Sequence, residues 1–140
     1  MKHLLLPVAF LLLSPVPTTA GEIPSEVECA RLIGKQRHWR VEVPMPDSTR
    51  CDLISETYAM EVEWASKWKE APAQATLYAI WTGKKPAVIL LVKSSDEKLD
   101  VLRCKMVCER LQIAMEVLDV RTLENGVSDE EESRTGNQSD

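Results

Sequence analysis

A continuous apolar segment in the second half of the chain, Ala-Val-Ile-Leu-Leu-Val at positions 87–92, places the strongest constraint on the fold. An uninterrupted run of aliphatic residues with polar residues on both sides predicts a strand that is buried on both faces. Such a strand belongs to a sheet that carries helices, because each of its faces must be covered by another packed layer. The run therefore predicts an α/β protein.

Apolar periodicity, turn residues and caps predict the remaining elements. Ser25 and Glu28 form a capping-box pattern at the start of a helix, and Trp39, Val41 and Val43 alternate as one face of a strand. In chain order we expect a helix over 24–36, strands over 39–45, 50–55 and 58–64, a helix from Pro72 to Gly83, the strand over 87–92, a helix capped by Ser95 and a last strand over 113–120. Short connections make the first three strands an antiparallel meander, whereas the later strands need helical crossovers. The order αβββαβαβ predicts one domain with a central mixed sheet flanked by helices.

Both ends of the chain are expected to lie outside this domain. Residues 1–20 combine a short basic start, an apolar run and small residues before Ala20, which is the pattern of a secretory signal peptide. A membrane anchor is the competing interpretation, but the apolar run is shorter than the ~20 residues of a span and is interrupted by prolines. We therefore expect an exported protein, periplasmic or secreted, with its domain over 21–123 and no stable membrane span after cleavage.

The C-terminal segment 124–140 is expected to be a disordered acidic tail, since it has one aliphatic residue and no aromatic one. It carries six acids and one base, which equals the net charge of −5 of the whole chain. Residues 1–123 are therefore neutral. A neutral body neither requires nor excludes a nucleic-acid partner.

The four cysteines fall into two pairs. Cys29 on the expected first helix and Cys51 on the expected second strand could meet in a disulfide across a helix–sheet contact, and free thiols are an equal alternative. Cys104 and Cys108 lie four residues apart on one helical face, where helix geometry does not favour a bond between the two sulfurs. We expect this second pair to be buried thiols.

Three acids are expected to gather on one face of the sheet. Glu61 and Glu63 alternate with apolar residues, so both point to the same side of their strand. If the strands 50–55 and 58–64 form a hairpin, Asp52 comes opposite or diagonal to Glu61. Converging carboxylates repel one another unless a cation lies between them, and oxygen ligands of this kind suit Mg²⁺ or Mn²⁺. The competing interpretation is a solvated sheet face, where alternating acids are common.

The helix that follows adds polar residues at helical spacing. Gln74 and Tyr78 are four apart and share a face. Lys67 lies seven residues before Gln74, so a continuous helix would place it on that face too, whereas Lys69 would point away. Pro72 weakens this argument because a proline belongs in a first turn and not in a helix interior.

Asp52, the segment Glu61-Val62-Glu63 on the next strand, and Gln74-x-x-x-Tyr78 on the next helix resemble the motifs of the PD-(D/E)XK nuclease superfamily. The pattern is similar in particular to the RecB-type branch, which has a Q-x-x-x-Y motif. The resemblance covers residues 25 to 120 and implies a restriction-endonuclease-like αβββαβ core, with an extra helix and strand at its C-terminal end. It also implies metal-dependent hydrolysis of phosphodiesters.

The resemblance assigns roles by position. Asp52, Glu61 and the main-chain carbonyl of Val62 would ligate Mg²⁺ or Mn²⁺. Glu63 stands where the family usually has a lysine, and Lys67 is the candidate for a lysine that has migrated to the next helix, so either residue would orient or deprotonate the attacking water. Gln74 and Tyr78 would support the site or the nucleic-acid backbone, and Glu28 could add an outer-sphere carboxylate beside its capping role.

The implied partner is nucleic acid, with DNA favoured, and self-association could supply specificity that so small a chain lacks. Candidate contacts are Arg50, Lys84, Lys85 and the stretch 35–40, which interleaves basic residues with Trp39. Two alternatives stay open. One is a catalytically inactive nuclease-fold binding module, and the other is an exported, disulfide-stapled α/β domain without metal.

Overall fold

The computed structural model describes residues 23–123, which form an α/β fold around one five-stranded mixed sheet. The strands lie side by side in the order in which they occur in the chain, β1-β2-β3-β4-β5. The pairs β1–β2 and β2–β3 are antiparallel, and the pairs β3–β4 and β4–β5 are parallel. The meander followed by crossovers is confirmed.

The boundaries of the elements lie close to those expected. In chain order they are α1 (Glu26–Arg37), β1 (Arg40–Pro44), β2 (Arg50–Ile54), β3 (Tyr58–Trp64), the 3-10 turn η1 (Ala65–Lys67), α2 (Ala71–Thr82), β4 (Lys85–Val92), the 3-10 turn η2 (Ser95–Glu97), α3 (Lys98–Leu111) and β5 (Ala114–Asp119). The capping box of Ser25 and Glu28 opens α1, and Gly83 closes α2 in the left-handed conformation. One cap differs from the expectation: Ser94, not Ser95, caps the turn before α3, because its hydroxyl accepts from the Asp96 amide.

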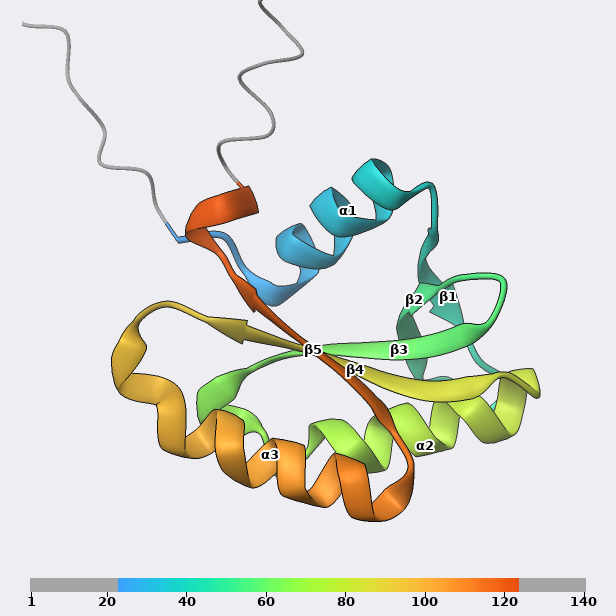
Figure 1. Cartoon of the computed structure of the whole chain (residues 1–140). Helices are drawn as coiled ribbons and strands as arrows, with labels where there is room; N and C mark the ends of the chain where they lie inside the picture. The colour runs from blue at the N-terminus through green and yellow to red at the C-terminus, as the bar shows by residue number, and fades with distance from the viewer. Residues whose placement is uncertain (1–22, 124–140) are drawn as a thin grey trace, which may run out of the picture.

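Helices cover both faces of the sheet. Figure 1 shows α1 above the sheet and α2 and α3 below it. The α1 layer is an apolar cluster that includes Ile33, Leu53 and Ile89, and the α3 layer is a second cluster that includes Val88 and Leu90. Val88, Leu90 and Leu91 are completely buried, so the apolar run of β4 is buried on both faces, as predicted.

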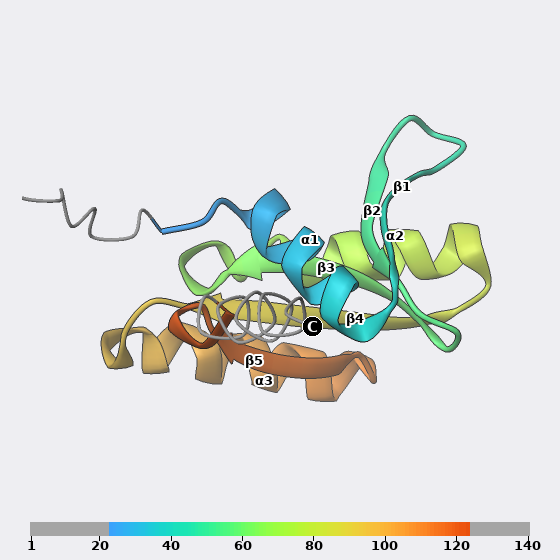
Figure 2. The ribbon, with the colours of Figure 1, turned by 90° about the horizontal axis from the view of Figure 1, so that it is seen from above.

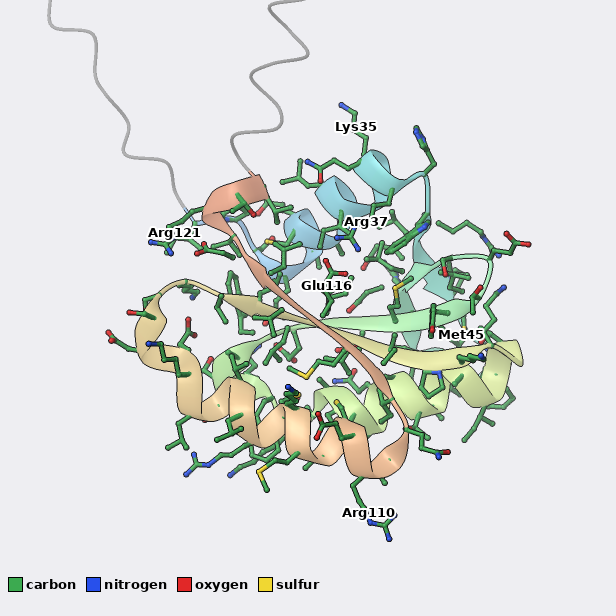
Figure 3. All side chains as sticks on the ribbon, in the orientation of Figure 1. Lys35, Arg37, Met45, Arg110, Glu116 and Arg121 are labelled. Carbon is green, nitrogen blue, oxygen red and sulfur yellow. The ribbon has the colours of Figure 1, made fainter. Side chains whose placement is uncertain are left out.

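An ion pair between α1 and β5 adds to this packing. The Arg37 guanidinium donates two hydrogen bonds to the Glu116 carboxylate, at 2.7 Å and 2.5 Å, and the two side chains point toward each other between the layers in Figure 3. Two parallel bonds fix the orientation of a planar guanidinium better than a single contact does. The pair therefore sets the position of the C-terminal end of α1 over the edge strand.

β1 changes face at Glu42, contrary to the expected regular alternation. Trp39 and Val41 pack against the α1-side cluster, whereas Val43 packs with Cys51, Met45 and other residues on the α2 side. Glu42 has φ 53°, a left-handed conformation that breaks the alternation of a strand. The hairpin beyond it consequently bends, and β1 and β2 run at a steep angle to β4 and β5 in Figure 2.

The same bend separates Cys29 from Cys51, so the disulfide that these two residues could have formed is not present. Cys29 lies in the α1-side cluster and Cys51 in the α2-side cluster, so the sheet separates them and they are not bonded to each other. Cys104 and Cys108 are buried thiols, as expected, with their sulfurs 3.9 Å apart. The disulfide-stapled alternative therefore has no bridge within residues 23–123.

The expected signal peptide over 1–20 and the expected tail over 124–140 fall outside the described residues. Among residues 23–123, no helix has the length and apolar character needed to span a membrane.

Candidate functional site

Pairing of β2 with β3 brings the predicted acids together. Leu53 pairs with Met60 and Ile54 with Ala59, so continuing this register places Asp52 opposite Glu61, as predicted. The register of β1 with β2 places Glu42 opposite Asp52 in the same way. One row across the sheet therefore carries an acid on each of three neighbouring strands.

The two glutamates of β3 are buried. Glu61 is 5% exposed and Glu63 is 4% exposed, and Val62 between them points into the α1-side cluster. The competing interpretation of a solvated acidic face is therefore wrong. Burying a carboxylate is costly unless it is neutralised or paired. These buried acids therefore require a physical reason, whereas acids on a solvated surface do not.

The side chain of Asp52 takes the place of a backbone hydrogen bond between β2 and β3. Pairing between the backbones of β2 and β3 ends at Leu53 and Met60. Beyond that point the Val62 amide donates to Asp52 Oδ2 at 2.8 Å. The Asp52 carboxylate is thereby fixed against the main chain of β3, beside the residue whose carbonyl was predicted as a ligand. The local sequence produces this arrangement because the bend at Glu42 and Asp52 separates the backbones where the ladder would continue.

Glu61 has an unusual electrostatic environment. Burial raises its pKa to about 9, and the nearby charges of Asp52 and Glu63 act in the same direction. Burial also raises the pKa of Asp52 to about 6, although the hydrogen bond from the Val62 amide opposes the shift. Glu61 Oε2 is buried and has no hydrogen-bond partner. The pair therefore holds a proton at neutral pH, in a position where a cation would serve equally well.

Tyr78 and Gln74 reach this pair from α2. Tyr78 is buried and its hydroxyl donates to Gln74 Oε1 at 3.3 Å, which confirms that the two residues share a helix face. The pKa of Tyr78 is raised, first by burial and then by the charge of Glu61. Tyr78 is therefore a neutral hydroxyl beside the acid pair.

Lys67 joins Glu63 by a route that differs from the prediction. It belongs to η1 and not to a continuous helix with Gln74, since α2 begins at Ala71. Its Nζ lies 2.9 Å from Glu26 Oε1 and 3.6 Å from Glu63 Oε1. The hydrogen bond with Glu26 is the first cause of the raised pKa of Lys67, so the lysine is a cation at neutral pH.

Glu63 is shared between this lysine and α1. Burial raises the pKa of Glu63 to about 7, and a hydrogen bond with Glu26 adds to the increase. One Glu63 oxygen also accepts from the Trp64 amide at 2.9 Å. Glu63 is therefore the acid of this cluster that exchanges a proton near neutral pH.

Glu26 and Glu42 are the site residues that sequence analysis missed. A helix N-terminus favours an acid in its first turn, so nothing in the sequence distinguishes Glu26 from an ordinary residue of that kind. Glu42 lies between two valines of a strand, where a polar residue is equally ordinary. Glu28, the acid that was considered, is occupied by the capping box with Ser25 at 2.7 Å. Only the packing of α1 on β3 and the left-handed φ of Glu42 bring the other two acids to the site.

The metal prediction can be compared with the donors present. Within residues 23–123, no group of three or more His, Cys, Asp or Glu side chains is arranged to hold a metal ion. The predicted metal site has only two carboxylate ligands, and its third ligand is a main-chain carbonyl. Asp52 and Glu61 are adjacent hard oxygen donors, and the orphaned Glu61 Oε2 fits a ligand atom. These residues fit a magnesium or manganese ion bound with water in its remaining positions.

The predicted nucleic-acid contacts separate into two places. Arg50 lies next to the acid row, with its Nη1 3.1 Å from Glu42 Oε2. Lys84 and the stretch around Trp39 lie together at the other end of β3. Trp81 on α2 is 45% exposed.

No protein-family model, curated protein or solved structure matches this chain.

Proposed function

We propose that this protein is a metal-dependent nuclease-like enzyme that hydrolyses phosphodiester bonds in nucleic acid, with a PD-(D/E)XK-type core. The observation that carries the proposal is the acid pair of Asp52 and Glu61, which faces Tyr78 with one buried oxygen unpartnered. A stable domain does not bury two adjacent acids for packing alone, because the cost of desolvation opposes it. A functional site explains the arrangement.

The order of elements supports the family assignment. Acids lie on β2 and β3, the Gln-x-x-x-Tyr pair lies on the helix that follows, and α1 and α2 cover opposite faces of the mixed sheet. This is the arrangement that the αβββαβ core of the superfamily would have. An exported enzyme of this kind would act on foreign or scavenged nucleic acid.

Asp52, Glu61 and the Val62 carbonyl would hold Mg²⁺ or Mn²⁺. When bound, such an ion supplies positive charge for the phosphoryl oxygens and lowers the pKa of a bound water. Asp52 is oriented for this role by the Val62 amide. Glu61 would release its proton in order to hold the ion, and Tyr78 and Gln74 lie beside the pair on α2.

Glu63 and Lys67 divide the work that a single lysine does in the usual motif. A raised pKa near 7 suits Glu63 to accept a proton from the attacking water. Lys67 is kept protonated by Glu26, so it is suited to bind an anionic phosphate oxygen and not to act as the base. Glu26 therefore sets both the charge and the position of Lys67.

A catalytically inactive binding module of the same fold is the second candidate. It is favoured by one observation: Lys67 already contacts Glu26 and Glu63, and a lysine held by two carboxylates is not free for substrate. The two candidates differ in turnover and not in fold.

Cleavage of labelled single- and double-stranded DNA and RNA by the purified chain in Mg²⁺ tests the proposal. We expect Asp52→Asn and Glu61→Gln to lower the rate at least ~100-fold, as loss of a group that stabilises transition-state charge does. Glu109→Gln is the matched control, because Glu109 is an exposed acid on α3, and it should cleave at the wild-type rate. Equal cleavage by wild type and Asp52→Asn would refute the assignment, and folded protein without any turnover would favour the inactive module.

A further inference from the structure

A pocket of about 280 Å³ lies at the end of the sheet where β3 begins, away from the Glu63 end of that strand. Three segments that are distant in the sequence form it. Its lining residues are His38, Trp39, Arg40, Ile54, Ser55, Glu56 and Lys84. The sequence had suggested a basic stretch around Trp39 and a separate pair of lysines at 84 and 85, and the fold brings them to one place.

Hydrogen bonds give this pocket a fixed rim. Lys84 Nζ donates to the Glu56 carbonyl at 2.6 Å, which ties the α2–β4 turn to the β2–β3 connection. Ser55 Oγ accepts from the Tyr58 amide at 2.9 Å and so fixes the same connection from within. Lys84 is therefore held in place at the rim of the pocket.

The pocket carries unneutralised positive charge. Arg40 is exposed, and within residues 23–123 neither Arg40 nor Lys84 has an ion-pair partner. Arg37 and Arg50, by contrast, are each bound to a glutamate. Glu56 is the one acid in the lining. The pocket thus offers arginine and lysine donors to an anion.

Trp39 gives the pocket an aromatic wall. It is half-buried against the α1-side cluster, and the Arg37 guanidinium lies 5.0 Å from the centre of its ring. An aromatic ring held by packing next to exposed cations is the combination that single-stranded nucleic acids use, because bases stack while the cations bind phosphates.

The position of the pocket relates it to the acid pair. Tyr58 begins β3 beside the pocket, and Glu61 follows three residues later, which is roughly 10 Å along a strand. A strand held in the pocket could therefore present a phosphodiester a few nucleotides away to the acids.

We propose that this pocket binds the phosphodiester backbone of a single nucleic-acid strand, with Arg40 and Lys84 on phosphates and Trp39 against a base. The inference rests on the proposed function for its biological meaning, but binding can be measured without cleavage. It assigns the substrate class, which is nucleic acid that is single-stranded near the cleavage point. It also places one binding site for that strand away from the predicted metal ligands.

The test measures binding of a fluorescent oligothymidylate by anisotropy, using the full-length Asp52→Asn chain in EDTA so that the probe stays intact. Each of Arg40→Gln and Lys84→Gln should weaken binding about fivefold at 0.1 M salt. Each should also reduce the slope of log affinity against log salt by about 0.7, the value for one lost phosphate contact on a single strand. Lys84→Gln keeps a donor for the Glu56 carbonyl, and circular dichroism confirms that each variant is folded.

Lys105→Gln is the matched control, since Lys105 is an exposed base on α3, and it should leave affinity and salt slope unchanged. Affinity that is equal in wild-type and pocket variants would overturn the proposal. If Arg40→Gln and Lys84→Gln lose binding to phosphatidylserine vesicles but still bind the oligonucleotide, the proposal is overturned and the pocket binds a membrane surface instead. Pocket-dependent binding by a chain that never cleaves would uphold this inference while refuting the proposed activity.

Discussion

At the scale of single residues, Glu61 is the group whose environment departs most from that of an ordinary surface acid. Its side chain is 5% exposed, one oxygen has no partner, and its nearest charged neighbours are acids. A protonated carboxyl tolerates this environment far better than a carboxylate does. The protein without bound metal is therefore expected to lose stability as the pH rises above the pKa of an unfolded glutamate, while folded Glu61 keeps its proton.

Substituting Glu61 by glutamine tests this directly. The folded state keeps the Glu61 proton up to a pKa of about 9, whereas an unfolded glutamate has lost it above about 4.5. The folded state therefore binds more protons between these values, and the free energy of unfolding falls as the pH rises through that window. In EDTA, Glu61→Gln should match wild type at pH 4.5 and be more stable by about 2 kcal/mol at pH 8.

Urea unfolding of both proteins across this pH range provides the measurement, because it gives the free energy of unfolding at each pH. Identical pH profiles for the two proteins would show that Glu61 is ionised in the folded state and would contradict the buried-acid account.

Residue-level prediction succeeded where strand register decided the outcome. Period two placed Glu61 and Glu63 on one face, and the hairpin placed Asp52 opposite Glu61. It failed for Glu26, since an acid at a helix N-terminus is explained by the helix dipole alone. It also failed for Glu42, because no sequence pattern predicts that this residue adopts the left-handed conformation, with φ 53°.

At the scale of elements, the contact between α1 and the β1–β2 pair positions the first helix over the site. Gly34 makes the close approach possible: a Cβ at this position would lie 2.3 Å from Val41 Cγ2 and 3.1 Å from Leu53 Cδ2. A glycine near the end of a helix often marks the point at which the helix stops. The helix in fact continues to Arg37, and the glycine is there for packing.

Gly34→Ala should therefore destabilise the protein by about 1 to 3 kcal/mol, as overpacking of a tight core does. Gly83→Ala is a matched control, since a Cβ there has nothing within 4 Å but φ is +69°. That change should cost about 1 kcal/mol through backbone strain alone. Thermal unfolding separates the two, and a Gly34→Ala variant as stable as wild type would show that α1 can move away from the strands without cost.

Element order was predictable because the patterns are local: caps, prolines, glycines and apolar periods fix where each helix or strand begins. The faces of β1 and β2 were not, because one backbone bend moved Val43 and Cys51 to the opposite side of the sheet from Val41 and Leu53. The possible bridge between Cys29 and Cys51 is absent for the same reason. If side chains are assumed to alternate regularly through such a bend, every residue beyond it is assigned to the wrong face of the sheet.

At the scale of the whole molecule, a site and a pocket lie along one strand. The acids of β3 meet α1, η1 and α2 toward one end, and the basic pocket around Trp39 lies toward the other. The neutral body thus separates its charges, with acids gathered toward one end of β3 and bases toward the other. Overall net charge could not reveal this division, because the two groups cancel.

Magnesium should stabilise the whole domain if Asp52 and Glu61 bind it, since a ligand of the native state raises the melting temperature. Saturating Mg²⁺ should raise the melting temperature of the wild type by roughly 5 °C at pH 8. The rise should be smaller at pH 6, because the ion must displace the Glu61 proton. Asp52→Asn should show no rise at either pH, and an equal rise in both proteins would place the ion elsewhere.

The most direct measurement of the central claim is phosphodiester cleavage by the wild-type chain in EDTA, followed by addition of excess Mg²⁺ to the same sample. The account predicts an intact oligonucleotide in EDTA, cleavage that begins when Mg²⁺ is added, and no cleavage at either stage with Asp52→Asn. Cleavage that proceeds in EDTA, or that Asp52→Asn carries out at the wild-type rate, would contradict it.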